Sequence, residues 1–246
     1  MALLTEEDVR RMSNNGTRGP VVVNQGDVLT PSARSFLKEH RVETVYPQGQ
    51  PEQDGTCTPE KAKYRTLFGA GLQEKPEHMT HLKGNILVFK DHPRIAFRGM
   101  IDLLEAEILL AQRAAADEGY AVLREELGET LAFVRGLIRC DVLDEPLENL
   151  KLCGYDAAQL REYSHYPDKY LGQPHFLPAC TDSRTLLQVN RARTIVRRTE
   201  LAAYAAFRDT DGNVTRPDLI LGLNRLSSLY WIMMIKLKAG NYERER

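Results

Sequence analysis

The chain has 246 residues, enough for one or two domains with a substantial hydrophobic core. Its 33 basic and 34 acidic residues leave a net charge of −1, which excludes the global positive field that draws a protein to nucleic acid or an anionic membrane. The four cysteines form no CxxC pair and no disulfide framework, so we expect reduced thiols and a cytoplasmic protein.

The first 76 residues are expected to form an N-terminal extension, ahead of a main domain over residues 77–246. Residues 1–19 are polar and contain no apolar run of the signal-peptide type. A small β-α-β unit is predicted from the run Val21–Val23, a helix from Thr30 to about His40, and an alternating strand over Val42–Tyr46. Residues 47–76 are rich in Pro, Gly and Gln, which indicates a linker or long loop.

From about Pro93 the apolar residues recur with helical spacing. This pattern predicts one long helix around residues 95–109 and a second around residues 123–138. Asp156 is a good N-cap for a short helix that ends before Pro167.

Two further long helices are predicted near the C-terminus. Asp182 or Ser183 opens the first, which runs to about Arg208, and Pro217 suits the first position of the second. Residues 219–237 are the most apolar segment, but a buried helix is favoured over a membrane span because the segment contains Asn224, Arg225 and Lys236. Four long amphipathic helices and one short one predict a mainly α protein with a helical-bundle fold.

The long helix that ends near Arg208 carries a charged stripe. Arg193, Arg197 and Glu200 lie at positions i, i+4 and i+7, so they share one face. Clustered guanidinium groups suit a polyphosphate, because each presents planar, bidentate donors. Taken alone, the stripe is more typical of a solvated helix face, whose ion pairs contribute only ~0.2–0.5 kcal/mol each.

Two other polar residues interrupt apolar patterns. Asn224 lies among leucines on the last helix, one turn before Ser228, and is equally consistent with a satisfied core residue and a ligand contact. Asp102 lies inside the apolar pattern of the first long helix, so an arginine of the charged stripe is a candidate partner, although a surface aspartate is the default.

Metal and nucleotide signatures are weak. His78, His81 and His92 could suggest a metal site, but only Cys57 lies nearby as a thiol, so we expect no protein-bound metal. The sequence contains no Walker A, GxGxxG or GxSxG motif. Thr80-His-Leu-Lys-Gly84 followed by Lys90 indicates at most a short polar loop.

Considered together, five segments resemble a known family: Thr80-His81-Leu82-Lys83-Gly84, Lys90-Asp91-His-Pro-Arg94-Ile, Gly99-x-x-Asp102-Leu, Arg193-Thr-x-x-Arg197-Arg198-x-Glu200 and Leu223-Asn224-Arg225-Leu226-Ser227. Their order and spacing, over residues 78–237, resemble the ATP:corrinoid adenosyltransferases of the propanediol-utilisation type. Four further segments resemble the ethanolamine-utilisation branch: Leu29-Thr30-Pro31-Ser32-Ala33-Arg34-x-x-Leu37, His78-Met-Thr80-His81-Leu82, His175-Phe-Leu-Pro178 and Asn224-Arg-Leu-Ser-Ser228.

The resemblance implies a five-helix bundle that binds ATP and cobalamin at a subunit interface of a homotrimer, or alternatively a homodimer. It implies transfer of the 5′-deoxyadenosyl group of ATP, with Mg²⁺, to cob(I)alamin. The ATP contacts implied are Arg193, Arg197, Arg198 and Asn224, with Glu200 as the orienting carboxylate and Thr80 and Lys90 in a triphosphate loop. Asp102 would pair with Arg193 across the interface, and Phe176 or Leu177 would lie on the corrin side.

The sequence departs from the family pattern at three places. Leu103 follows Asp102 where the family has a glutamate, and Ser228 replaces the acid that usually ends the Asn-Arg-Leu-Ser motif. Some members of the ethanolamine branch have a cysteine-rich metal motif before the bundle, where this chain has only Cys57.

The resemblance also implies a cellular setting. A role in ethanolamine utilisation, a flavin-type reductase, and a location in the cytoplasm or in a bacterial microcompartment are expected. Two other functions remain open from the residues: a non-catalytic carrier of corrinoid or nucleotide, and a phosphotransferase that uses the same arginines.

Overall fold

The computed structural model describes residues 3–14, 21–23, 27–40, 42, 44–45 and 62–245. The chain divides into two compact units, Met1–Glu60 and Lys61–Arg246. Part of the predicted linker belongs to the second unit, because Tyr64–Thr66 and Gly71–Leu72 form strands β5 and β6. The second unit therefore starts before residue 77, since these two strands are hydrogen-bonded into its sheet.

The first unit contains helices α1 (Glu6–Asn14) and α2 (Pro31–Glu39). Within its described residues, two pairs of parallel two-residue strands form: β1 (Leu3–Leu4) with β3 (Val28–Leu29), and β2 (Val21–Val22) with β4 (Thr44–Val45). The parallel pairing of β2 and β4 around α2 confirms the predicted β-α-β unit. Its buried core consists of Leu4, Val9, Val21, Val23, Ala33 and Leu37.

The second unit begins with a four-stranded sheet in the order β6-β5-β8-β7. Strand β7 (Met79–Lys83) pairs antiparallel with β8 (Ile86–Phe89), and β5 pairs parallel with β8. Thr80 is therefore part of a strand, and the expected polar loop is reduced to the turn at Gly84, whose φ is +54°. Met79 and Leu82 are the buried residues of β7, and their spacing of three residues coincides with a register irregularity between His81 and Lys83.

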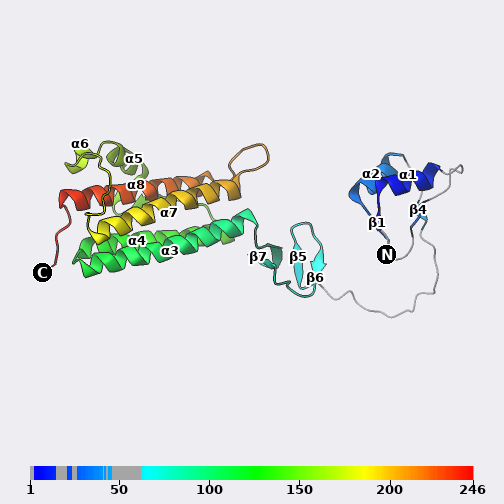
Figure 1. Ribbon diagram of the computed structural model, residues 1–246, viewed down its shortest axis with the longest axis horizontal. Coiled ribbons are helices and arrows are strands. Elements are labelled where there is room, and N and C mark those ends of the chain that lie inside the picture. Colours follow the sequence, from blue (N-terminus) through cyan, green and yellow to red (C-terminus); the bar gives the residue numbers. More distant parts are fainter. Residues whose placement is uncertain are drawn as a thin grey trace. The chain divides into compact units, whose positions relative to one another are not determined.

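Four long helices lie side by side after the sheet (Figure 1). They are α3 (Pro93–Asp117), α4 (Ala121–Leu143), α7 (Arg184–Phe207) and α8 (Pro217–Ala239). Two short helices, α5 (Ala157–His165) and α6 (Pro167–Leu171), follow the small hairpin of β9 (Lys151–Leu152) and β10 (Tyr155–Asp156). The predicted helical bundle is confirmed, and so is the short helix that Asp156 caps and that ends before Pro167; α6, which begins at Pro167, was not predicted.

Local chemistry explains the helix boundaries. The Ser183 hydroxyl accepts a hydrogen bond from the backbone N–H of Leu186, 3.1 Å away, at the start of α7. Pro93 and Pro217 occupy the first positions of α3 and α8, where a missing N–H costs nothing. Gly240 ends α8 in the left-handed conformation, with φ of +75°.

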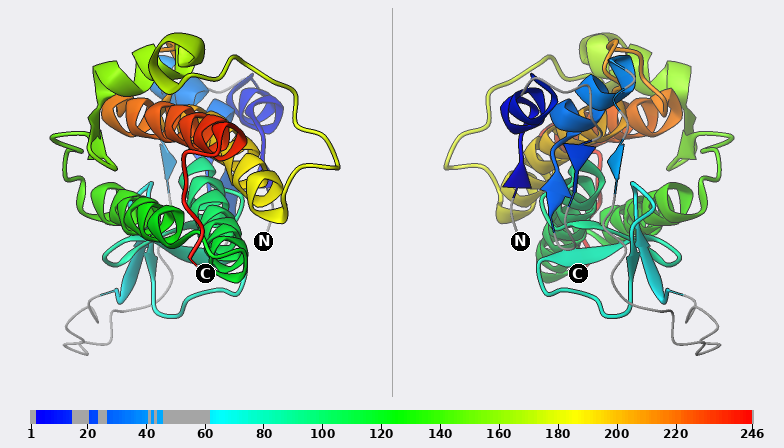
Figure 2. Two further views of the ribbon diagram at one scale, coloured as in Figure 1. Left: turned by 90° about the vertical axis from the view of Figure 1, so that its left-hand side faces the viewer. Right: turned by 90° about the vertical axis from the view of Figure 1, so that its right-hand side faces the viewer.

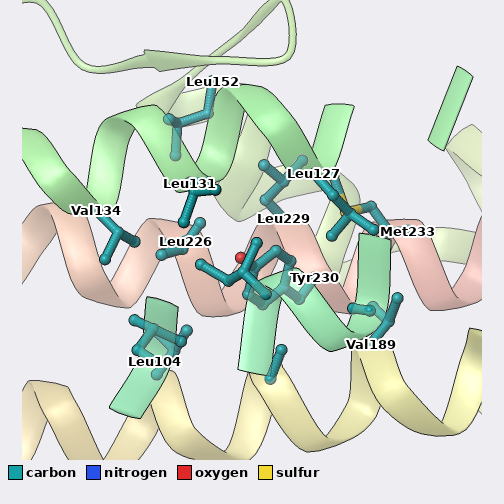
Figure 3. Packing of buried hydrophobic residues seen from close by; sticks show 14 of the residues in the cluster. Leu104, Leu127, Leu131, Val134, Leu152, Val189, Leu226, Leu229, Tyr230 and Met233 are labelled. Atoms are coloured by element: carbon teal, nitrogen blue, oxygen red, sulfur yellow. The ribbon is translucent and has the colours of Figure 1, made fainter. Parts of the chain in front are cut away.

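Figure 2 views the long helices roughly along their axes, and the main core fills the space between them (Figure 3). Leu104, Leu127 and Met233 are fully buried there, and Tyr230 lies at the centre. The Tyr230 hydroxyl is 2.9 Å from the hydroxyl of Thr130, so this buried polar group is satisfied. No helix in the described part of the chain is long and apolar enough to cross a membrane.

Candidate functional site

The charged stripe of α7 lies beside α8. Arg193 is half-buried, and both its Nε and its Nη2 donate hydrogen bonds to Asn190 Oδ1, at 3.2 and 3.0 Å. Its guanidinium lies over the ring of Trp231, 5.4 Å from the centroid. Burial, and then the nearby charge of Arg197, lower the pKa of Arg193. Arg193 is thus a preorganised cation held by α7 and α8.

Glu200, Asn224 and Arg225 form a connected group. Asn224 Nδ2 donates to Glu200 Oε1 at 3.0 Å, and Arg225 Nη1 donates to Asn224 Oδ1 at 2.7 Å. Asn224 is not a buried core residue, because its side chain is exposed and bridges α7 and α8, and its contact with a ligand stays a prediction. Glu200 accordingly orients Asn224, and forms no ion pair with Arg193 or Arg197 among the described residues.

These residues border a polar pocket of about 480 Å³. Its lining comes from α5, α7 and α8: Arg161, His165, Arg197, Glu200, Leu201, Asn224, Arg225, Ser227 and Ser228. The volume is within the usual range of small-molecule sites. Three guanidinium groups against one carboxylate make this pocket suitable for an anion.

A second pocket, of about 320 Å³, is richer in apolar and aromatic side chains and is here called the aromatic pocket. Its lining comprises Ser164, Phe176, Leu177, Pro178, Arg193, Arg197, Ser227, Ser228 and Trp231. The two pockets share Arg197, Ser227 and Ser228. The two pockets therefore adjoin, and together they are here called the groove, cationic at one end and aromatic at the other.

Aromatic contacts hold the segment between α6 and α7 against α8. Phe176 stacks on Trp231 with the ring centroids 5.3 Å apart. Trp231 Nε1 donates to His175 Nδ1 at 3.1 Å, and His175 Nε2 lies 3.3 Å from the carbonyl oxygen of His165. Because a carbonyl oxygen only accepts, Nε2 of His175 must carry the proton. Leu177 is 92% exposed, so it can cover a ligand at the mouth of the aromatic pocket.

Four of the expected site residues do not line either pocket: Asp102, Thr80, Lys90 and Arg198. Thr80 pairs with Val88 in the sheet, and the exposed Lys90 lies 3.7 Å from Glu77 in an ion pair. Arg198 is exposed on α7, next to Arg197 but on another face of the helix.

Asp102 does not meet Arg193 within one chain. It is exposed on α3, and no ion pair or hydrogen bond to it is found among the described residues. Arg98 and Glu105, which are about one turn away on either side, both contact α4 through Asp141 and Arg135. Asp102 therefore lies on the α4 side of α3, whereas Arg193 faces α8.

The sequence analysis missed the contribution of α5. Arg161 and His165 are spaced i, i+4 and both border the polar pocket. The available signal was the Asp156 cap followed by two basic residues one turn apart. It was insufficient because only tertiary packing decides that α5 lies against α8.

The three histidines considered for metal binding have other contacts. His92 Nδ1 accepts from the backbone N–H of Arg94 at the start of α3, and His78 stacks on Phe89. His81 Nδ1 is 3.1 Å from the carbonyl oxygen of Gly84. Within the described ranges no group of three or more His, Cys, Asp or Glu is placed to hold a metal ion, and Cys57 lies outside them.

Comparisons with known proteins show which family the chain resembles. The family model described as cobalamin adenosyltransferase matches residues 71–237. The corrinoid adenosyltransferases EutT of Salmonella typhimurium (strain LT2) and Escherichia coli (strain K12) are each 32% identical over 224 residues, covering 84% of this chain and 81% of those proteins.

Solved structures to which the chain is similar include variants of a PduO-type ATP:corrinoid adenosyltransferase from Lactobacillus reuteri. One variant, complexed with cobalamin and ATP, is 20% identical, with a TM-score of 0.49, covering 68% of this chain and 93% of that one. Another variant, complexed with ATP, is 18% identical, with a TM-score of 0.49, and the match covers 69% of this chain and 96% of that one.

Proposed function

The chain belongs to the cobalamin adenosyltransferase family, and we propose that its groove is where the 5′-deoxyadenosyl group of ATP is transferred to the cobalt of cob(I)alamin. One observation carries this assignment to the groove. The cationic polar pocket and the aromatic pocket meet at Arg197, Ser227 and Ser228. A reaction between a polyphosphate ester and a flat, largely apolar macrocycle needs these two environments side by side.

The chemistry determines which end takes which substrate. Cobalt(I) attacks C5′ of ATP, the Co–C bond forms, and the C5′–O bond breaks with its electron pair leaving on the triphosphate. The polyphosphate then lies in the polar pocket, the corrin edge lies against Phe176, Leu177 and Trp231, and the ribose lies at the junction. Because cobalt(I) is itself a strong nucleophile, the protein needs to supply only positioning and electrostatics.

The arginines supply the electrostatic part. Arg197 belongs to both pockets and has no ion-pair partner among the described residues, so its guanidinium is available to the leaving phosphate. Arg193 is held by Asn190 and Trp231 one turn away. Alignment of cobalt with C5′ can lower the barrier by roughly 7–11 kcal/mol, the range for well-oriented intramolecular reactions.

The proposal includes Mg²⁺ bound with ATP. Mg²⁺ keeps several waters and takes phosphate oxygens plus one or two carboxylates, so it does not require a protein cage. Glu200 is the one carboxylate that lines the polar pocket in the described part of the chain, and one of its oxygens already accepts from Asn224. When bound, Mg²⁺ would neutralise charge on the polyphosphate.

A second copy of the chain would complete the site. Asp102, Thr80 and Lys90 lie outside both pockets, and the aromatic pocket is too small to cover a whole corrin. A homotrimer, or alternatively a homodimer, could place these residues beside the groove of a neighbouring copy. The ethanolamine-utilisation role, a flavin-type reductase and a microcompartment location complete the proposal and rest on the family resemblance.

Adenosylation of chemically reduced cob(I)alamin by the purified full-length chain tests this function. We expect ATP-dependent conversion of the cob(I)alamin spectrum to that of adenosylcobalamin. Cobalamin binding with no spectral change on adding ATP and reductant would instead identify a carrier. Release of ADP without corrinoid would identify a phosphotransferase.

A further inference from the structure

Helix α5 borders the polar pocket, and its cap and a buried leucine fix its position. The Asp156 carboxylate accepts from the backbone N–H groups of Ala158 and Gln159, at 2.9 and 2.8 Å, and Gln159 Oε1 accepts from the Asp156 N–H in return. This capping box holds the first turn. Leu160, which is fully buried, anchors the same helix in the main core. The backbone from which α5 side chains reach the pocket is therefore held in place.

Arg161 is a cation without a protein partner at this position. It is exposed, it borders the polar pocket, and its guanidinium has no hydrogen bond or ion pair within the described ranges. Its backbone carbonyl accepts from His165 Nδ1 at 2.7 Å and from Ser164 Oγ at 3.0 Å, which further orders the end of the helix.

Arg225, on α8, is an independent sign of a missing anion. Its side chain borders the same pocket and only 9% of the residue is exposed. Nη1 donates to Asn224, but the buried Nε has no hydrogen-bond partner, and no carboxylate lies within ion-pair distance among the described residues. A buried charge that lacks a counter-ion is costly, so a ligand is expected to supply one.

The two guanidinium groups also act on each other. Burial, and then the charge of Arg161, lower the pKa of Arg225, while the charge of Glu200 opposes these effects. Two cations held near one another from different helices destabilise the empty site. Binding of a multiply charged anion between them would supply the counter-ion that buried Arg225 lacks and would offset the repulsion between the two cations.

We propose that Arg161 of α5 and Arg225 of α8 form an anion subsite that binds the polyphosphate of ATP. Helix α8 lies between α5 and α7 (Figure 1), so Arg161 and Arg197 would approach the polyphosphate from the two helices that flank α8. This inference rests on the proposed function and adds α5 to the polyphosphate-binding wall. Arg161 is the residue that distinguishes it from a site built on α7 and α8 alone.

The test compares Arg161→Gln with the full-length wild-type chain, using inorganic tripolyphosphate as the probe. In the adenosylation assay we expect the KM for ATP and the Ki of tripolyphosphate to rise by about tenfold, the effect of losing one charge-assisted hydrogen bond. The KM for cob(I)alamin should change by less than about twofold, because Arg161 does not line the aromatic pocket. Arg161→Lys should fall in between, since it keeps the charge and loses the bidentate geometry.

Arg124→Gln is the matched control, because Arg124 is an exposed arginine of α4 that borders neither pocket. Unchanged ATP and tripolyphosphate constants in Arg161→Gln, with normal circular dichroism, would overturn the subsite. Calorimetric titration of tripolyphosphate needs no turnover, so it tests the subsite separately. A wild-type chain that binds tripolyphosphate through Arg161 but forms no adenosylcobalamin would refute the proposed function and leave the subsite standing.

Discussion

The guanidinium of Arg193 lies over the indole of Trp231, 5.4 Å from the ring centroid, and so joins the charged stripe of α7 to the aromatic pocket. Phe176 also stacks on this indole, and the Trp231 N–H donates to His175. One side chain of α8 thus orients both Arg193 and the segment proposed to contact the corrin.

Replacement of Trp231 should therefore affect both substrates. We expect Trp231→Leu to lower kcat/KM by about tenfold, because it removes a cation–π contact and an aromatic stack of roughly 0.5–2 kcal/mol each. Trp231→Phe, which keeps a ring but loses the N–H to His175, should retain more activity. Steady-state kinetics with each substrate varied in turn would measure this, and equal activity in the leucine variant and the wild type would contradict it.

Neighbouring arginines on α7 offer a matched pair. Arg197 borders both pockets, whereas Arg198 borders neither. We expect Arg197→Ala to reduce kcat/KM for ATP by at least about 100-fold, since a charge-assisted contact to the leaving group is lost. Arg198→Ala should retain more than about a tenth of the activity. Equal losses would place Arg198 in the site of a neighbouring copy, as the family resemblance implies.

The proposed pairing of Asp102 with Arg193 across a subunit interface can be tested by mixing chains that each lack one of the two residues. Asp102→Ala and Arg193→Ala chains should each be weakly active alone. Mixed oligomers should regain activity, because one interface in each then carries both native residues. Light scattering after size exclusion would establish the number of copies. A fully active monomer, or no recovery on mixing refolded chains, would argue against a shared site.

The ion pairs at the start of the bundle should matter for stability. Asp141 is fully buried and accepts from Arg94 Nε at 2.8 Å and from Arg98 Nε at 2.6 Å. We expect Asp141→Ala to lower the free energy of unfolding by roughly 3–5 kcal/mol, because part-buried Arg98 loses its carboxylate partner and Arg94 is left with the Asp144 carboxylate, 3.5 Å away. The control is Arg139→Ala, whose exposed pair with Glu145 should contribute less than about 1 kcal/mol. Urea unfolding measures both changes.

The cap of α3 should make stability depend on pH. Burial, and then the charges of Arg94 and Arg98, lower the pKa of His92 from its ordinary value of 6.5. Neutral His92 is therefore favoured in the folded state. The stabilisation that it gives to the folded state is fully present above pH 6.5 and is lost as pH falls through the lowered folded pKa. His92→Asn keeps a capping acceptor and should flatten this dependence in urea midpoints between about pH 7.5 and 5. If the urea midpoint of the asparagine variant changed with pH as steeply as that of the wild type, His92 would not be the source of the pH dependence.

Much of the bundle was predictable from local chemistry. Ser183 and Asp156 start helices at the expected places because an N-cap satisfies backbone donors within its own turn. The strand at Thr80 was predicted as a loop, because its pairing partner at Val88 is a non-local choice that the short polar motif does not reveal.

Six of the expected site residues reach the groove, and α5 was not foreseen. Arg193, Arg197, Glu200 and Asn224 were recognised by spacing along single helices, and Phe176 and Leu177 through the resemblance. Arg161 was overlooked, since a basic residue on a short helix is usually solvated.

The sequence by itself determined the helices, their caps and the order of the charged and apolar segments, because these depend on contacts within a few residues of each other. Only the tertiary structure decided that Arg161, Arg197 and Arg225 face one pocket and that Asp102 lies away from it. The physical reason is that convergence of charge depends on how α5, α7 and α8 pack, and burial of apolar faces sets that packing without regard to the polar side chains it brings together.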